Sequence, residues 1–223
     1  MTSKVPPAPA SARPLFGTTL PLVEEYARLL AGPGVERGLL GPREVERLWE
    51  RHLLNCAVLA DLVPARSSVV DLGSGAGLPG IVLAVIRPDV ALTLLEPMLR
   101  RATFLTECVE RLCLPGVEVR RARAEDVAGE VRVDVVTARA VAPLDRLSRW
   151  ALPLLRPGGV LLALKGARAP DELSRTRATV ERLGAVTAGV VRVGEGRIDP
   201  PATVVRVVAG SHPRSRPASR RKR

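Results

Sequence analysis

A glycine-rich turn between an apolar stretch and a helical stretch is the part of this sequence best suited to bind a small ligand. The segment Ser68–Ile81 reads SVVDLGSGAGLPGI, in which Asp71 stands ahead of Gly73, Gly75 and Gly77. A residue without a Cβ adopts positive φ easily and lets the backbone approach a bound nucleotide or nucleoside closely. In open α/β sheets, such a turn lies at the ligand-binding edge. The turn therefore predicts a nucleotide or nucleoside site without identifying the ligand.

An acid at the end of the next predicted strand is the first partner of this turn. Glu96 lies about twenty residues further on, where a carboxylate can accept hydrogen bonds from both ribose hydroxyls of an adenosine. The turn contains no basic residue that would favour a pyrophosphate, and Asp71 directly precedes it. A cofactor with an ammonium group and no phosphate fits these charges, and S-adenosylmethionine (SAM) is such a cofactor. The GxGxxG spacing of residues 75–80 alone also permits NAD.

Two later segments reach the same sheet edge. Ala124 and Glu125 follow the predicted third strand, where an adenine ring edge and its exocyclic amine could be held. Arg139 ends the fourth strand, and it either pairs with one of these acids or faces the substrate.

The elements that must position these residues alternate between strand and helix from Ser68 onward. This order predicts an α/β fold with a mostly parallel sheet and helices on both faces. Seven strands are expected, near residues 68–71, 90–95, 117–121, 131–137, 160–164, 186–193 and 203–208. Helices are expected at 21–31, from Pro42 onward, after the glycine turn, and near 99–112, 143–154 and 171–183. The chain is expected to divide into a flexible leader (1–14), a helical N-terminal extension (15–66), the main domain (67–210) and a basic disordered tail (211–223).

Composition points to a polyanionic partner. The 223 residues carry a formal net charge of +11, and +5 remains without the six basic residues that follow Ser211.

Three cysteines without CxxC spacing suggest neither a disulfide framework nor a zinc site. His52 and Cys56 lie four residues apart, and core packing is the preferred interpretation over a shared metal. With no signal peptide or membrane-spanning run, we expect a cytoplasmic protein, monomeric and without metal.

Several sequence blocks together resemble one family of enzymes. The blocks VVDLGSGAGLPGIVLAVIRPD, LTLLEPMLRRATFL, RAED, VTARAVAPL and LLALKG resemble the RsmG (GidB) family of small-subunit ribosomal RNA guanine-N7 methyltransferases. The resemblance runs from about Trp49 to Gly166, and Asn55 replaces the acid usual in the family. It implies a Rossmann-like class I SAM-dependent methyltransferase fold. It also implies that SAM contacts Gly73, Leu78, Glu96, Ala124, Glu125 and Arg139, to which the turn itself adds Asp71, Gly75 and Gly77 as expected cofactor-binding residues.

The resemblance also implies the reaction, which is methyl transfer from SAM to N7 of a guanine in 16S ribosomal RNA or the small ribosomal subunit. Guanine N7 has a lone pair and no proton, so alignment can do most of the work without a general base. Arg139 and Lys165 are the candidates for positioning the guanine or its phosphate, with structural ion pairs as the equal alternative. The competing functions are an NAD-dependent oxidoreductase and an RNA-binding assembly factor that kept a SAM fold without catalysis.

Overall fold

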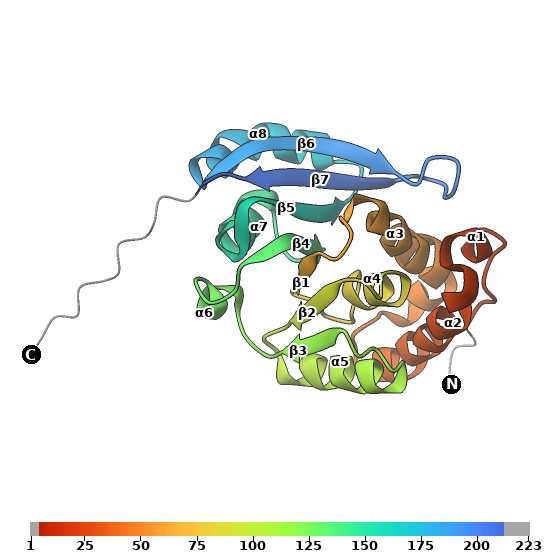
Figure 1. The fold of residues 1–223 in the computed structure, drawn as a ribbon. Helices are drawn as coiled ribbons and strands as arrows, with labels where there is room; N and C mark the ends of the chain where they lie inside the picture. The colour runs from red at the N-terminus through yellow and green to blue at the C-terminus, as the bar shows by residue number, and fades with distance from the viewer. Residues whose placement is uncertain (1–4, 212–223) are drawn as a thin grey trace, which may run out of the picture.

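A seven-stranded mixed sheet forms the centre of the protein (Figure 1). The computed structural model describes residues 5–211, so the basic tail expected after Ser211 lies outside the described residues. The strand order is β3-β2-β1-β4-β5-β7-β6, with β1 to β5 parallel and β7 antiparallel to both of its neighbours. The strands are β1 (Ser68–Leu72), β2 (Ala91–Leu95), β3 (Val117–Arg120), β4 (Val133–Arg139), β5 (Leu155–Lys165), β6 (Ala185–Val193) and β7 (Ala202–Ala209). The predicted α/β class and mostly parallel seven-stranded sheet are confirmed.

Two layers of helices cover the sheet, one on each face. Successive side chains along a strand point to opposite faces, so each buried strand packs against both layers. Val69 of β1 belongs to one buried cluster, with helices α4 (Gly80–Ile86) and α5 (Leu99–Arg111). Val70 belongs to the other cluster. The helices of this second face are α6 (Ala124–Val127), α7 (Leu144–Ala151) and α8 (Ala169–Arg182). Both faces of the parallel strands are therefore buried, as a parallel sheet requires.

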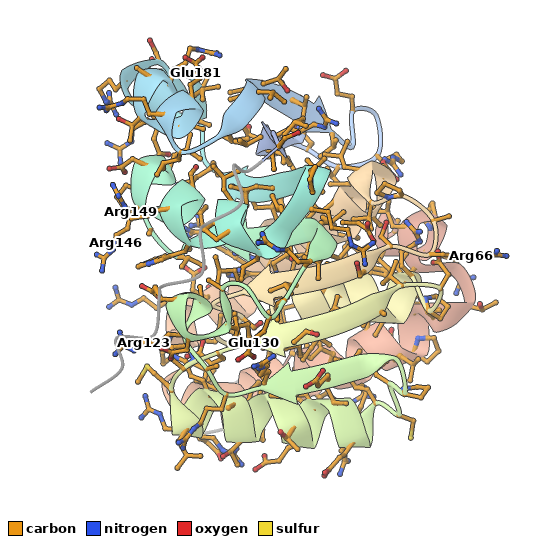
Figure 2. All side chains as sticks on the ribbon, turned by 60° about the vertical axis from the view of Figure 1, so that its left-hand side comes forward. Arg66, Arg123, Glu130, Arg146, Arg149 and Glu181 are labelled. Carbon is orange, nitrogen blue, oxygen red and sulfur yellow. The ribbon has the colours of Figure 1, made fainter. Side chains whose placement is uncertain are left out.

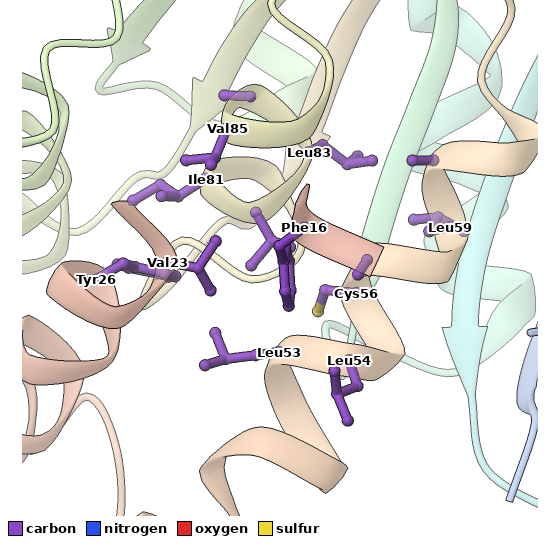
Figure 3. Close-up of a cluster of buried hydrophobic side chains, with 14 of the residues drawn as sticks. Phe16, Val23, Tyr26, Leu53, Leu54, Cys56, Leu59, Ile81, Leu83 and Val85 are labelled. Atoms are coloured by element: carbon purple, nitrogen blue, oxygen red, sulfur yellow. The ribbon is translucent and has the colours of Figure 1, made fainter. Parts of the chain in front are cut away.

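The N-terminal segment is helical and belongs to the first of these layers. Its α-helices are α1 (Ala12–Phe16), α2 (Leu20–Leu29) and α3 (Leu54–Ala57), joined by 3-10 and π turns at 17–19, 30–34, 42–53 and 58–62. Figure 3 shows side chains of α1, α2 and α3 in one cluster with Ile81, Leu83 and Val85 of α4. The helix predicted from Pro42 is thus a series of short helical turns, and the extension packs into the same core as β1 and β2.

The flexible leader expected at residues 1–14 is wrong for its described part. Trp49 donates its indole N–H to the carbonyl of Pro6 at 2.9 Å, and Ala12 opens α1 fully buried. The Pro- and Ala-rich composition suggested a chain without periodicity. It did not reveal that a buried tryptophan needs an acceptor for its indole N–H.

The start of the fifth strand also differs from the prediction. The fifth strand was expected near 160–164, yet β5 begins at Leu155 and includes Pro157, Gly158 and Gly159. The pairing with β4 shifts here, from Val133 opposite Leu155 to Val135 opposite Val160, so the glycines lie in an irregular stretch within the strand. A Cβ on Gly159 would lie 2.9 Å from the carbonyl oxygen of Arg156, which explains the glycine there.

In the described part of the chain, no helix has the length and apolarity needed to cross a membrane.

Candidate cofactor and substrate site

A cavity of about 290 Å³ opens where the loops after β1, β2, β3 and β4 meet. Four of the predicted residues line it, namely Gly73, Glu96, Ala124 and Glu125. They come from three different strand ends that the parallel topology brings to one edge of the sheet. The wall also includes Leu72, Leu95, Pro97, Met98, Arg101, Ala122, Arg123, Ala140, Val141, Arg146 and Trp150.

Glu96 is the buried acid of this cavity. Its side chain is 1% exposed, and its two oxygens each accept one backbone hydrogen bond, from the N–H of Gly75 and the N–H of Met98, both at 3.0 Å. A carboxylate has about four lone-pair sites, so about two remain for a ligand and for the Arg101 guanidinium, which lies 3.9 Å from one oxygen. Glu96 therefore holds the glycine turn against the end of β2 and can still accept hydrogen bonds from a diol such as a ribose.

Gly73 brings bare backbone to the cavity wall. Its φ is +66°, a conformation that side chains rarely adopt, and a Cβ there would meet the Val141 methyl groups at 3.1 and 3.2 Å. The Gly73 N–H donates to the Leu95 carbonyl at 2.8 Å, and this hydrogen bond holds the turn against the end of β2. The cavity depends on a glycine at this position for both reasons.

Asp71 does not line the cavity, so its assignment as a cofactor-binding residue stays a prediction. Its carboxyl group is fully buried and accepts hydrogen bonds from the Thr137 hydroxyl at 2.8 Å and from the Gly80 N–H at 3.2 Å. Burial is the main cause that raises the pKa of Asp71, from 3.8 to about 6. The side chain follows the alternation of β1 to the face opposite Val70, so it ties the turn to β4 and to the start of α4.

Three other turn residues also lie outside the cavity wall. Gly75 takes part through its N–H, which binds Glu96. A Cβ on Gly77 would lie 2.4 Å from Ile81 and 2.8 Å from the Tyr26 hydroxyl, so close packing explains this glycine. Leu78 is half-buried and packs on the first hydrophobic cluster. The resemblance suggested a cofactor contact for Leu78, and the cavity wall does not include it.

Arg139 is directed toward the N-terminal helices, and its side chain does not line the cavity. Its guanidinium donates to His52 Nδ1, and to Cys56 Sγ at 3.5 Å. His52 Nε2 lies 2.7 Å from a carboxylate oxygen of Glu44. Because Nδ1 accepts from Arg139, the neutral ring carries its proton on Nε2 and donates to Glu44. Burial, then the charge of Arg139, lower the pKa of His52 from 6.5 to about 4, so the ring is neutral at pH 7.

Lys165 takes part in an ion pair at the end of β5. Its ammonium donates to Glu172 of α8 at 2.9 Å and to the carbonyl of Ala142 at 2.9 Å. The Lys165 side chain is 14% exposed. This arrangement favours the structural alternative for Lys165, which fixes the loop that follows β4.

In the described part of the chain, no cluster of three His, Cys, Asp or Glu could hold a metal.

The sequence interpretation missed the arginines and the aromatic ring of the wall. Arg101, Arg123, Arg146 and Trp150 all line the cavity. Arg146 lies over the Trp150 ring, with the guanidinium carbon 4.7 Å from the ring centroid. The i, i+4 spacing of Arg146 and Trp150 on the helix after the fourth strand was the available signal, since this spacing places both side chains on one helix face.

Comparisons with known proteins agree with this geometry. The family described as GidB, rRNA small subunit methyltransferase G, matches residues 19–199. The ribosomal RNA small subunit methyltransferase G of Thermobifida fusca is 61% identical over 207 residues, 93% of this chain and 87% of that protein. The protein of the same name from Streptomyces avermitilis is 58% identical over 212 residues, 95% of this chain and 89% of that protein.

Solved structures support the fold. The S-adenosylmethionine-dependent methyltransferase SibL, solved in its apo form, superposes with a TM-score of 0.60 at 16% identity, covering 90% of this chain and 70% of that one. At this identity, the likeness concerns the fold alone. The family pattern and the two relatives span most of the sequence, and this chain therefore belongs to the rRNA small subunit methyltransferase G (GidB) family.

Proposed function

We propose that this protein transfers the methyl group of SAM to N7 of a guanine in 16S ribosomal RNA. The observation that carries the proposal is the buried Glu96 carboxylate, which faces a cavity shared with Gly73, Ala124 and Glu125. Membership of the family gives the substrate class, because its relatives are named ribosomal RNA small subunit methyltransferases. We further propose that the enzyme acts in the cytoplasm as a monomer without metal, on the rRNA or the small subunit.

The residues present fit SAM as the cofactor. The free lone pairs of Glu96 suit the ribose hydroxyls, and the bare backbone at Gly73 leaves room for the amino-acid part. Ala124 and Glu125 at the start of α6 suit the adenine edge. Pro97 and Met98 supply apolar wall beside them. Bound SAM would supply an electrophilic methyl group on a sulfonium.

The reaction requires little of the protein besides alignment of the guanine with the methyl donor. Guanine N7 has an in-plane lone pair and loses no proton, so no base has to remove one. The chain's own tasks are to hold the purine in line, to exclude water and to balance the charge that develops on the ring. Two arginines of the wall, Arg123 and Arg146, are cations beside the cavity and suit the O6 and phosphate oxygens of the RNA, whereas Arg101 pairs with Glu96 at 3.9 Å.

A labelling experiment tests the proposal. Purified protein is incubated with tritiated SAM and small ribosomal subunits that lack the modification, and the rRNA nucleosides are then separated. We expect labelled 7-methylguanosine from the wild type. Label in another nucleoside would contradict the N7 assignment, and no label with intact SAM binding would favour an assembly factor without catalysis.

Two variants serve as a matched pair in this assay. Glu96→Ala removes the cavity carboxylate and should abolish SAM binding measured by calorimetry. Glu118→Ala removes an exposed acid of β3 that has no role in the cavity and should behave as wild type. Binding of NADH with no binding of SAM would support the oxidoreductase alternative instead.

A further inference from the structure

The cavity has one wall that cofactor binding does not explain. Arg146 and Trp150 of α7 line it on the side formed by the helix after β4, together with Arg123 at the start of α6. The residues that line the cavity and are assigned to the cofactor, namely Gly73, Glu96, Ala124 and Glu125, follow β1, β2 and β3. The α7 wall therefore remains available for the second substrate.

The two tryptophans of the chain are placed in different ways. Trp49 is 2% exposed, and its indole N–H is bonded to Pro6, so it is a core residue. Trp150 is only half-buried and contacts the cavity. Arg146, one turn earlier on the same helix, stacks over its ring at 4.7 Å. Trp150 also packs on the second hydrophobic cluster, which fixes its ring. An aromatic ring on a cavity wall, stacked with a guanidinium, is a combination that holds unpaired nucleic-acid bases.

Arginines without a salt-bridge partner in the described residues lie on this side of the molecule. Figure 2 shows Arg123, Arg146 and Arg149 on the same side of the molecule, the first at the N-cap of α6 and the other two on α7. Within residues 5–211, none of the three forms a salt bridge. The carboxylate of Asp126 accepts the backbone N–H of Arg123 at 3.3 Å. Guanidinium groups without a carboxylate partner suit the phosphates of an RNA strand.

We propose that Trp150 and Arg146 form a stacking site for an unpaired base of the RNA substrate, with Arg123 and Arg149 holding its phosphates. This inference rests on the proposed function, because it names how the same site receives RNA. A base that enters the cavity must leave its helix, and a ring on the wall offsets part of the stacking that it loses. The site should therefore favour single-stranded or splayed RNA over a duplex.

Three substitutions at one position separate stacking from packing. Trp150→Phe keeps an aromatic ring, Trp150→Leu keeps apolar bulk without a ring, and Trp150→Ala removes both. The readouts are affinity for a fluorescein-labelled 12-nucleotide single-stranded RNA, affinity for the same sequence as a duplex, and affinity for SAM. A matched control is Arg175→Ala on α8, an exposed arginine outside the cavity.

Loss of one stacked base corresponds to about 1–3 kcal/mol, or about 5- to 150-fold in affinity. We expect Trp150→Leu and Trp150→Ala to weaken single-stranded RNA binding by at least fivefold, Trp150→Phe to stay within about threefold, and SAM affinity to stay near wild type. Arg149→Ala should lower the slope of log K against log salt by about 1. Equal RNA affinity for Trp150→Leu and Trp150→Phe would overturn the inference, as would a loss of SAM affinity with RNA binding unchanged.

Failure of the stacking site can be distinguished experimentally from failure of the proposed function. If the wild type forms 7-methylguanosine and the KM for small subunits is unchanged in Trp150→Leu, the stacking site is wrong and the proposed function stands. If the wild type forms none while stacking behaves as expected, the proposed function fails alone.

Discussion

Asp71 gives the sharpest prediction, because a buried acid with a raised pKa makes folding stability depend on pH. In the folded protein, burial raises the pKa of Asp71 from 3.8 to about 6. The folded state therefore holds a proton that the unfolded chain releases between these values. The stabilisation is fully present below pH 3.8 and is lost as the pH rises through about 6. We expect Asp71→Asn to remove this dependence, since the amide does not titrate.

The magnitude follows from the two pKa values. The full difference corresponds to about 3 kcal/mol, and about 2 kcal/mol of it falls between roughly pH 4.5 and 7.5. The amide also changes the local hydrogen bonds. Its NH₂ group would face the Gly80 N–H, and only its carbonyl could still accept from Thr137. That effect is a nearly constant loss at every pH, so it does not alter the slope.

Urea unfolding at several pH values between 4.5 and 7.5 measures the difference. The free energy of unfolding of the wild type minus that of Asp71→Asn should fall by about 2 kcal/mol as the pH rises across this range. Contributions from all other titrating groups cancel in the subtraction. Parallel pH profiles for the two proteins would refute the reasoning, because Asp71 would then titrate alike in the folded and unfolded states.

Three further substitutions test other contacts of the site. Glu96→Ala leaves the N–H groups of Gly75 and Met98 without their acceptor, so besides losing SAM it should lower the free energy of unfolding by about 1–3 kcal/mol in urea titrations; unchanged stability would contradict its role in holding the turn. His52→Gln should remove a pH dependence opposite in sign to that of Asp71, because the lowered pKa of His52 adds stability above pH 6.5 that is lost as the pH falls toward about 4; an unchanged acid limb of the wild-type profile would count against it. Lys165→Met should lower stability by roughly 1–3 kcal/mol through its lost ion pair, whereas a hundredfold fall in kcat at unchanged stability would make Lys165 a group that acts on the RNA.

Much of the fold could be predicted from the sequence, because the strands are short apolar runs with clear boundaries. Alternation along β1 and the turn at 73–80 placed the first strand and the start of α4 close to their observed limits. Residues 5–14 and the start of β5 were mispredicted. In both cases a tertiary contact overrides local composition, namely the Trp49 bond to Pro6 and the irregular pairing of β4 with β5.

The site was predicted in part, and side-chain direction explains the difference. Gly73, Glu96, Ala124 and Glu125 follow strand ends, where topology alone brings residues to one edge. Asp71 and Arg139 lie outside the cavity wall, because the position of Asp71 in β1 directs its side chain into the layer under the turn and the N-terminal helices supply the acceptor of Arg139. Neither direction can be read from spacing along the chain.

The hydrogen bond between α2 and the glycine turn can form only after the chain has grown well beyond α2. The Tyr26 hydroxyl donates to the carbonyl of Ala76 at 2.7 Å, fifty residues further along the chain. The same cluster includes Phe104 of α5, which is synthesised later still. Ribosomes add on the order of 5–20 residues per second, so the apolar face of the first helices waits several seconds for its partners. During that interval the apolar side chains of Phe16, Val23 and Tyr26 lack the partners that bury them in the finished fold.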